Sequence, residues 1–176
     1  MGNSSDHDSL FNTWLEEHQG IVVKIARSFS ANLSDFDELR QELLLRVWIS
    51  AKTFTGQSKA STWIYRVCLN TAMSWRRSTD RRERRMDSSA NLRTMKTDSI
   101  SPADNLGDQE ILEQLYTAIH ALKPGDRALV LLSLDGLTYR EMAEITGLSE
   151  NHVGVVLTRA RQRLGKLLKG ITDELE

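Results

Sequence analysis

Residues 138–159 read TYREMAEITGLSENHVGVVLTR, and they decide how the second half of the chain folds. Thr138 and Glu141 have the spacing of a capping box, which predicts that a helix begins here. Gly147 suits the left-handed position that ends such a helix, and Ser149 is placed to cap the next one. Two helices joined by so short a turn are typical of a helix-turn-helix.

The packing of two such helices makes three demands on the sequence. Ala143 supplies a small residue where the helices touch, Gly147 tolerates the turn, and Val153 anchors the second helix. The remaining core-facing positions hold Met142, Leu148 and Val156. An αα-corner that does not bind DNA would meet the same demands, so it stays open as an alternative.

The second helix of this pair is expected to reach about Leu168 and to present one face to solvent. That face would consist of Glu150, Asn151, Gly154, Val155, Thr158 and Arg159. Asn151 and Arg159 suit base edges or phosphates, and Val155 could touch a thymine methyl group. The register therefore predicts the side of the helix that enters a major groove.

The charges of the chain are distributed unevenly, although the 176 residues carry a net charge of only −1. Residues 1–50 hold 4 basic and 8 acidic side chains, residues 51–100 hold 11 and 4, and residues 101–176 hold 8 and 12, for nets of −4, +7 and −4. The last third still has a cationic run without an intervening acid: Arg159, Arg161, Arg163, Lys166 and Lys169. Two basic patches indicate a polyanion that is contacted at two places, and solvated helix faces are the alternative.

Composition excludes several classes of protein. The single cysteine, Cys68, rules out a disulfide framework and cysteine-rich zinc sites, and we expect it to fill the core. No apolar run approaches the roughly 20 residues that span a bilayer, and the polar N-terminus is not a secretory signal. We therefore expect a soluble, cytoplasmic protein without stable membrane insertion. No phosphate loop, catalytic triad or metal-spaced histidine pair occurs, so no enzymatic activity, cofactor, metal or small-molecule substrate is expected.

Helical periodicity extends over most of the chain, so we expect an all-α protein. It predicts helices over residues 10–29, from a cap at Ser34 to about Ala51, and from Ser61 into an arginine-rich stretch. After that stretch Ser, Thr, Asn and Asp replace the apolar pattern, which is typical of a flexible linker. Beyond the linker, Pro124 suits a first helical position. The expected division is an N-terminal tail (1–9), a first helical domain (10–80), a linker (81–108) and the helix-turn-helix domain (109–172).

The first domain combines three features. Asp35, Glu38, Gln41 and Glu42 follow one another at helical spacing and would line one face of a helix. Residues 54–66, FTGQSKASTWIYR, join aromatic rings to cations, and Asn70 and the pair Arg76–Arg77 follow. Exposed rings beside cations suit single-stranded nucleic acid, because a base can stack while the cations hold its backbone. Phe54, Trp63 and Tyr65 could equally be ordinary core residues.

In these motifs and their order, the chain resembles a bacterial RNA polymerase sigma factor of the extracytoplasmic-function (ECF) type, in the sigma-70 family. Asp35-Phe-Asp-Glu38-Leu39-Arg-Gln41-Glu42 is similar to the helix of the family's second region, with Glu38 in place of the usual Asp. The segment from Phe54 to Arg77 is similar to the part that melts and reads the −10 element. Leu122-Lys-Pro124-x-x-Arg127 and residues 136–144, continued by Arg159-Ala160-Arg161, resemble the fourth region.

The resemblance implies a function and a set of sites. The protein would bind core RNA polymerase, through its β′ and β subunits, and direct initiation at promoter DNA without doing bond chemistry itself. The implied polymerase-binding residues are Asp35, Glu38, Leu39, Gln41 and Glu42. The implied −10 residues are Phe54, Lys59, Ser61, Trp63, Tyr65, Arg66, Asn70, Arg76 and Arg77. The implied −35 residues are Arg140, Ser149, Glu150, Asn151, His152, Val155, Thr158, Arg159, Arg161 and Arg163.

One departure and two alternatives accompany this hypothesis. Gly154-Val155-Val156 stand where the family usually has polar or basic residues, which bears on the −35 preference. The resemblance also implies an anti-sigma factor as an inhibitory partner. A stand-alone helix-turn-helix regulator would instead bind duplex DNA tightly by itself, and a helical adaptor unrelated to DNA would leave both basic patches idle.

Overall fold

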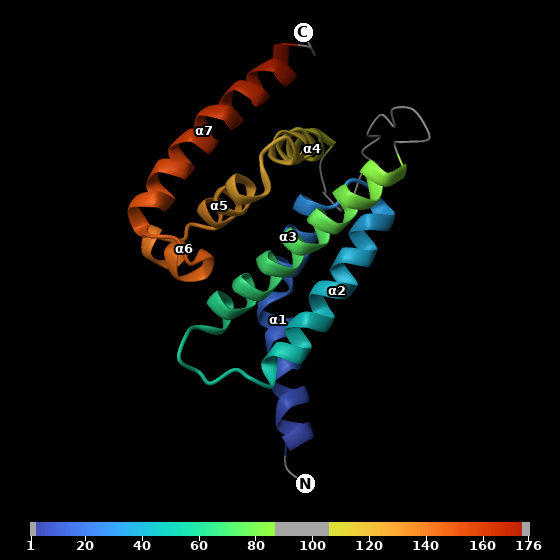
Figure 1. Cartoon of the computed structure of the whole chain (residues 1–176), viewed down its shortest axis with the longest axis vertical. Helices are drawn as coiled ribbons and strands as arrows, with labels where there is room; N and C mark the ends of the chain where they lie inside the picture. The colour runs from blue at the N-terminus through green and yellow to red at the C-terminus, as the bar shows by residue number, and fades with distance from the viewer. Residues whose placement is uncertain (1–2, 87–105, 174–176) are drawn as a thin grey trace. The chain divides into compact units, whose positions relative to one another are not determined.

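The structure is a computed structural model that describes residues 3–86 and 106–173. These residues form seven α-helices and no strand, which confirms the all-α prediction. The chain divides into two compact units, residues 1–98 and 99–176, which we call unit 1 and unit 2 and describe separately. Figure 1 labels the helices in chain order.

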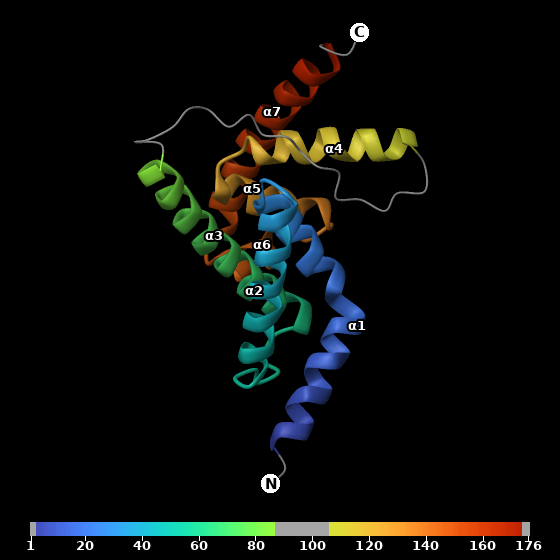
Figure 2. The same cartoon turned by 90° about the vertical axis from the view of Figure 1, so that its right-hand side faces the viewer.

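Unit 1 is a bundle of three helices, each of which packs against the other two: α1 (Asn3–Phe29), α2 (Leu33–Ala51) and α3 (Ala60–Met86). Figures 1 and 2 show the three lying side by side. Apolar residues that recur every three or four positions meet at the centre of the bundle, where Phe29, Leu43 and Ile64 are almost fully buried. This core holds the exposed faces of α2 and α3 in place.

The beginning of α2 corrects one prediction. Asn32, not Ser34, is the N-cap, and its side-chain oxygen accepts a hydrogen bond of 2.9 Å from the backbone N–H of Asp35. Asn is as good a cap as Ser, so the helix begins two residues earlier than expected. Ser34 then lies in the first turn, and Asp35 also accepts a bond of 3.0 Å from the Asn32 amide.

Helices α1 and α3 are longer than their apolar periodicity predicted. Helix α1 already begins at Asn3, inside the expected tail, and the Trp48 indole of α2 donates to Asp8 at 3.3 Å. Helix α3 continues to Met86, supported by an ion pair of 3.0 Å between Arg76 and Asp80 one turn apart. Polar partners therefore extend helices where apolar residues run out. Residues 81–86 and 106–108 are helical, and the rest of the expected linker lies outside the described residues.

Unit 2 is built around its last helix. Helices α4 (Leu106–His120), α5 (Pro124–Leu134) and α6 (Tyr139–Thr146) all contact α7 (Glu150–Asp173), which ends five residues beyond the expected end. Pro124 stands at the start of α5, as predicted. Buried Leu129, Leu132 and Leu157 belong to the core between these helices.

Arg127 fixes the corner between α4 and α5. Its guanidinium is buried, and it donates hydrogen bonds to the backbone carbonyls of His120 and, at 3.1 Å, Leu122. Carbonyls at the C-terminal end of a helix lack partners within the helix, and a cation placed there also favours the helix dipole. Arg127, which entered the sequence analysis only as part of a family motif, therefore stabilises the corner between α4 and α5.

Candidate nucleic-acid interface

The turn between α6 and α7 has the geometry of a helix-turn-helix. The Thr138 hydroxyl accepts from the Glu141 backbone N–H at 3.2 Å, and the Glu141 carboxylate accepts from the Thr138 N–H at 3.0 Å, so the predicted capping box is present. Gly147 ends α6 with φ of 76° and donates to the Ala143 carbonyl. Ser149 accepts from the His152 N–H at 3.3 Å, as a cap of α7 should.

The core of this motif differs in part from the expected one. Met142 and Val153 are buried as predicted, whereas Ala143, Leu148 and Val156 are only half-buried. The deeper positions are Ile145, Leu157 and Ala160, which the sequence analysis did not single out. Their signal was available, because Val153, Leu157 and Ala160 follow the i, i+4, i+7 spacing of a buried helix face.

One side of α7 forms a shallow groove of about 480 Å³. Its lining contains all six residues of the predicted DNA-facing side and one more, Tyr139 from the start of α6: Tyr139, Glu150, Asn151, Gly154, Val155, Thr158 and Arg159. The Thr158 hydroxyl donates to the Gly154 carbonyl at 2.8 Å, within the helix. The structure therefore gathers the expected contact residues on one surface.

The other residues of the expected −35 set have several placements. Arg140, His152 and Arg163 are exposed. Ser149 is exposed too, but its hydroxyl is engaged in the cap. Arg161 donates to the Ser133 hydroxyl at 2.6 Å and so joins α7 to α5. Arg161 and Ser149 thus contribute to the packing of the unit.

In unit 1 three members of the acidic-amide cluster, Glu38, Gln41 and Glu42, line a groove of about 820 Å³ between α2 and α3, whereas Asp35 lies outside it. Residues of α2 form one wall, and residues of α3 form the other: Glu38, Gln41, Glu42, Leu45 and Arg46, and Asn70, Thr71, Ser74, Trp75 and Ser78. Glu42 pairs with Arg46 at 2.7 Å, while Glu38 and Gln41 are exposed. Asn70, one of the expected −10 residues, also lines this groove.

Leu39 does not belong to that surface. Its side chain is 0% exposed and packs in the core of the bundle, so it cannot contact a partner directly. The helical period explains the difference, because position 39 lies on the face of α2 that also carries buried Phe36 and Leu43. Leu39 supports the exposed cluster from behind.

The three aromatic residues of the expected −10 set form part of the packing. Tyr65 is 6% exposed, and burial together with nearby Cys68 raises the pKa of its hydroxyl to about 12. Phe54 is half-buried. Its ring centroid lies 5.0 Å from that of Trp14 and 5.6 Å from that of Trp63, and both contacts are edge to face. Tyr65 is therefore a core residue and not an exposed stacking surface.

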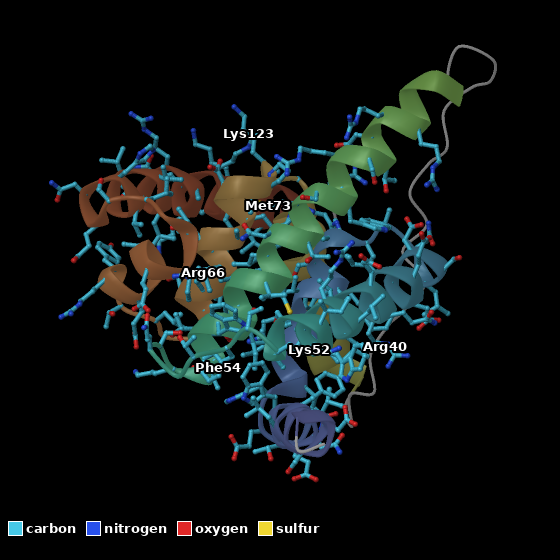
Figure 3. The ribbon with its side chains drawn as sticks, turned by 60° about the horizontal axis from the view of Figure 1, so that its bottom comes forward. Arg40, Lys52, Phe54, Arg66, Met73 and Lys123 are labelled. Atoms are coloured by element: carbon cyan, nitrogen blue, oxygen red, sulfur yellow. The ribbon has the colours of Figure 1, made fainter. Side chains whose placement is uncertain are left out.

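Trp63 is half-buried and is held in one orientation, because its indole nitrogen donates to the Ser50 hydroxyl at 3.1 Å. Figure 3 shows Phe54 at the connection between α2 and α3, with Arg66 and Met73 along α3. Rings with so many partners are fixed, and each leaves only part of its surface open to a ligand.

The polar residues of the expected −10 set lie in and after that connection. Lys59 and Arg77 are exposed, while Ser61, Arg66 and Arg76 are half-buried. Arg76 is paired with Asp80, and Arg77 donates to the Ser74 hydroxyl at 3.0 Å. Cations thus follow α3 from its first turns to its basic end, which is the distribution that the charge pattern of residues 51–100 indicated.

Other kinds of site find little support in the described part of the chain. Within residues 3–86 and 106–173 no group of three His, Cys, Asp or Glu side chains is placed to hold a metal. No described helix is at once long and apolar enough to cross a membrane. Cys68 is buried, as expected, and burial raises the pKa of its thiol to about 12. A thiol with so high a pKa is a poor nucleophile.

Known proteins match both units. Residues 14–82 match the family Sigma-70 region 2, and residues 112–164 match Sigma-70, region 4. The ECF RNA polymerase sigma-E factor of Haemophilus influenzae is 27% identical over 162 residues, which cover 88% of this chain and 85% of that protein. The ECF sigma factor SigG of Mycobacterium tuberculosis is also 27% identical, over 94% of this chain and 50% of SigG.

A solved structure agrees with the fold. The sigma factor RpoE of Bartonella quintana, solved with the anti-sigma factor NepR, superposes with a TM-score of 0.69 at 22% identity, over 90% of this chain and 96% of RpoE. A stand-alone helix-turn-helix regulator is not favoured, because unit 1 matches a sigma region in its own right. With both regions present in order, and with relatives of this kind along most of its length, the chain belongs to the sigma-70 family and is an ECF sigma factor.

Proposed function

We propose that the two units divide promoter-directed initiation between them. Unit 1 binds core RNA polymerase through the groove between α2 and α3 and holds the opened −10 element. Unit 2 binds the −35 element through the exposed face of α7. The observation that carries this proposal is the groove of unit 1, where the acidic-amide residues of α2 face polar residues of α3 in a unit that matches Sigma-70 region 2.

The groove suits a basic partner helix. Glu38 and Gln41 are exposed, and Glu42 is open enough to share its charge with a partner as well as with Arg46. Charge complementarity of this kind increases the association rate and fixes orientation. Leu45 and Trp75 add an apolar part to the lining, which supplies contact area. In sigma factors the implied partner is the pair of clamp helices of the β′ subunit.

At the −10 element Phe54 and Trp63 would form one side of the site that holds an unstacked base. Phe54 and Trp63 keep part of their ring surface open, and Lys59, Arg66, Arg76 and Arg77 supply cations on the same unit. Taking one base out of the duplex stack costs a few kcal/mol, which stacking on an aromatic ring together with phosphate contacts would offset. Because the rings are already held in place, ordering them on binding costs little conformational entropy.

At the −35 element the groove on α7 meets the base edges. Asn151, Glu150 and Arg159 offer the hydrogen-bonding groups that read adenine, cytosine and guanine in the major groove. Arg140, His152 and Arg163 are exposed and suit the neighbouring phosphates. Ser149 and Arg161 act indirectly, because they hold α7 in position.

The proposed function also bears on the chemistry, the cellular location and the inhibition of the chain. The chain does no bond chemistry, because nucleotidyl transfer belongs to the polymerase. It acts in the cytoplasm, where that polymerase works. An anti-sigma factor inhibits it by covering polymerase-binding surfaces; RpoE of Bartonella quintana, with which it shares the fold, was solved bound to such a protein.

The test is transcription in vitro with purified core polymerase and a promoter library. Specific transcripts are expected only when the chain is added, and they should depend on both promoter elements. The charge reversal Glu38→Lys should reduce them, whereas Asp37→Lys, an exposed acid outside the groove on the same helix, is the matched control. Absence of specific transcripts across the library would contradict the proposal.

A further inference from the structure

Tyr139 and Gly154 make an unusual contact on the face of α7. Tyr139 is the first residue of α6, and its ring lies over Gly154 so closely that a Cβ there would be 3.3 Å from ring atom Cε2 and 3.7 Å from Cδ2. A contact of 3.3 Å is tighter than ordinary van der Waals packing, so a Cβ at position 154 would push the ring away by a few tenths of an ångström. Glycine therefore admits the ring to this surface.

The contact produces an apolar area at the centre of the exposed face of α7. Tyr139 is 41% exposed and Val155 is 50% exposed, and both line the groove. Glu150 and Asn151 precede this area along α7, and Thr158 and Arg159 follow it. An apolar centre between hydrogen-bonding groups is therefore what α7 would present to a major groove.

Base pairs offer one apolar group in the major groove, the C5-methyl of thymine. Exposed apolar side chains at the centre of a recognition face gain free energy only where such a methyl removes them from water. We propose that Tyr139 and Val155 read thymine methyl groups in the −35 element, and that Gly154 determines this specificity by admitting the Tyr139 ring. The inference rests on the proposed function and adds the base chemistry that α7 selects.

The test compares thymine with deoxyuridine, which lacks only the methyl group. A promoter is selected with core polymerase and the full chain from a library randomised at −35, and each −35 thymine is then replaced by deoxyuridine. Below saturating template, wild type should transcribe the deoxyuridine template about three- to fourfold less for each contacted methyl, since burying one carbon group changes binding by about that factor.

Variants connect this ratio to the residues. Val155→Ala and Gly154→Ala should each lower the thymine-to-deoxyuridine ratio, because the first removes one of the two apolar contacts and the second shifts the Tyr139 ring. Tyr139→Phe keeps the ring and should keep the ratio. Leu134→Ala is the matched control, as a similarly exposed apolar residue of unit 2 outside the groove.

The outcomes separate the inference from the proposed function. Equal transcription of the two templates by wild type, or a full ratio in Val155→Ala, overturns the inference while promoter-specific transcription stands. No specific transcript from any template overturns the proposed function and the inference together.

Discussion

The surfaces that we propose to face DNA in the two units differ in how much they also contribute to stability. In unit 2 the residues of the α7 groove are exposed or half-exposed, and the packing is carried by other positions such as Met142, Val153 and Leu157. In unit 1 the candidate −10 rings are part of the packing, since Phe54 lies between Trp14 and Trp63. We therefore expect recognition and stability to be separable in unit 2 and coupled in unit 1.

The largest effect is expected from truncating the coupled surface. Trp63→Ala removes the edge contact with Phe54 and the hydrogen bond to Ser50, and we expect it to lower the free energy of unfolding of unit 1 by about 3 kcal/mol. Urea unfolding followed by circular dichroism measures it. Trp63→Phe keeps a ring and should lose only about 1 kcal/mol. A loss below 1 kcal/mol in Trp63→Ala would mean that the ring is not needed for packing.

The separable surface should behave in the opposite way. Arg159→Ala removes an exposed cation from the α7 groove, so we expect about a tenfold loss of −35-dependent transcription with the free energy of unfolding unchanged within about 0.5 kcal/mol. Lys169→Ala, an exposed cation further along α7 and outside the groove, is the control. If Arg159→Ala destabilised unit 2 as much as it reduced transcription, the two surfaces would not differ.

A third change tests where the stability of the helix-turn-helix does reside. Thr138→Ala removes the capping box of α6 and leaves every polar group of the α7 groove in place. We expect a loss of about 1 kcal/mol in the free energy of unfolding. Thr138→Ser retains the hydroxyl and should retain most of that stability. Thermal unfolding of the two variants gives the comparison, and equal melting temperatures would show that the cap contributes nothing.

The smallest effect concerns Gly154, where stability and recognition should change in opposite directions. Alanine has a helix propensity about 1 kcal/mol better than glycine, but its Cβ must displace the Tyr139 ring. Since that ring is exposed and able to move, we expect Gly154→Ala to raise the free energy of unfolding by a few tenths of a kcal/mol. Urea unfolding measures it, and a free energy of unfolding lower than that of the wild type would refute it.

Features that depend on near neighbours in the chain could be predicted from the sequence, whereas contacts between helices could not. The caps at Thr138, Glu141 and Gly147 depend on neighbours within four residues, so local spacing predicted them correctly. The exposed face of α7 follows from the helical period alone. The contact of Tyr139 with Gly154 joins two helices, and its geometry depends on how they cross, which local spacing does not determine.

In unit 1 the local patterns were insufficient for the same reason. An aromatic residue near cations is compatible with both a DNA contact and a core position, and only tertiary packing decided that Tyr65 is buried. The place of Asn70 in the groove depends on the pairing of α2 with α3. Leu39 entered the polymerase-binding set through the family resemblance, although helical spacing places it on the same side of α2 as Leu43.

The most direct test of the central claim is the affinity of the full chain for core RNA polymerase. Glu38→Lys combined with Glu42→Lys reverses charge in the α2–α3 groove, and Asp35 is left unchanged because it bonds the cap of α2. We predict at least a tenfold increase in Kd relative to wild type, with Asp37→Lys close to wild type. An unchanged Kd for the double variant, or no association of the wild-type chain at all, would contradict the claim.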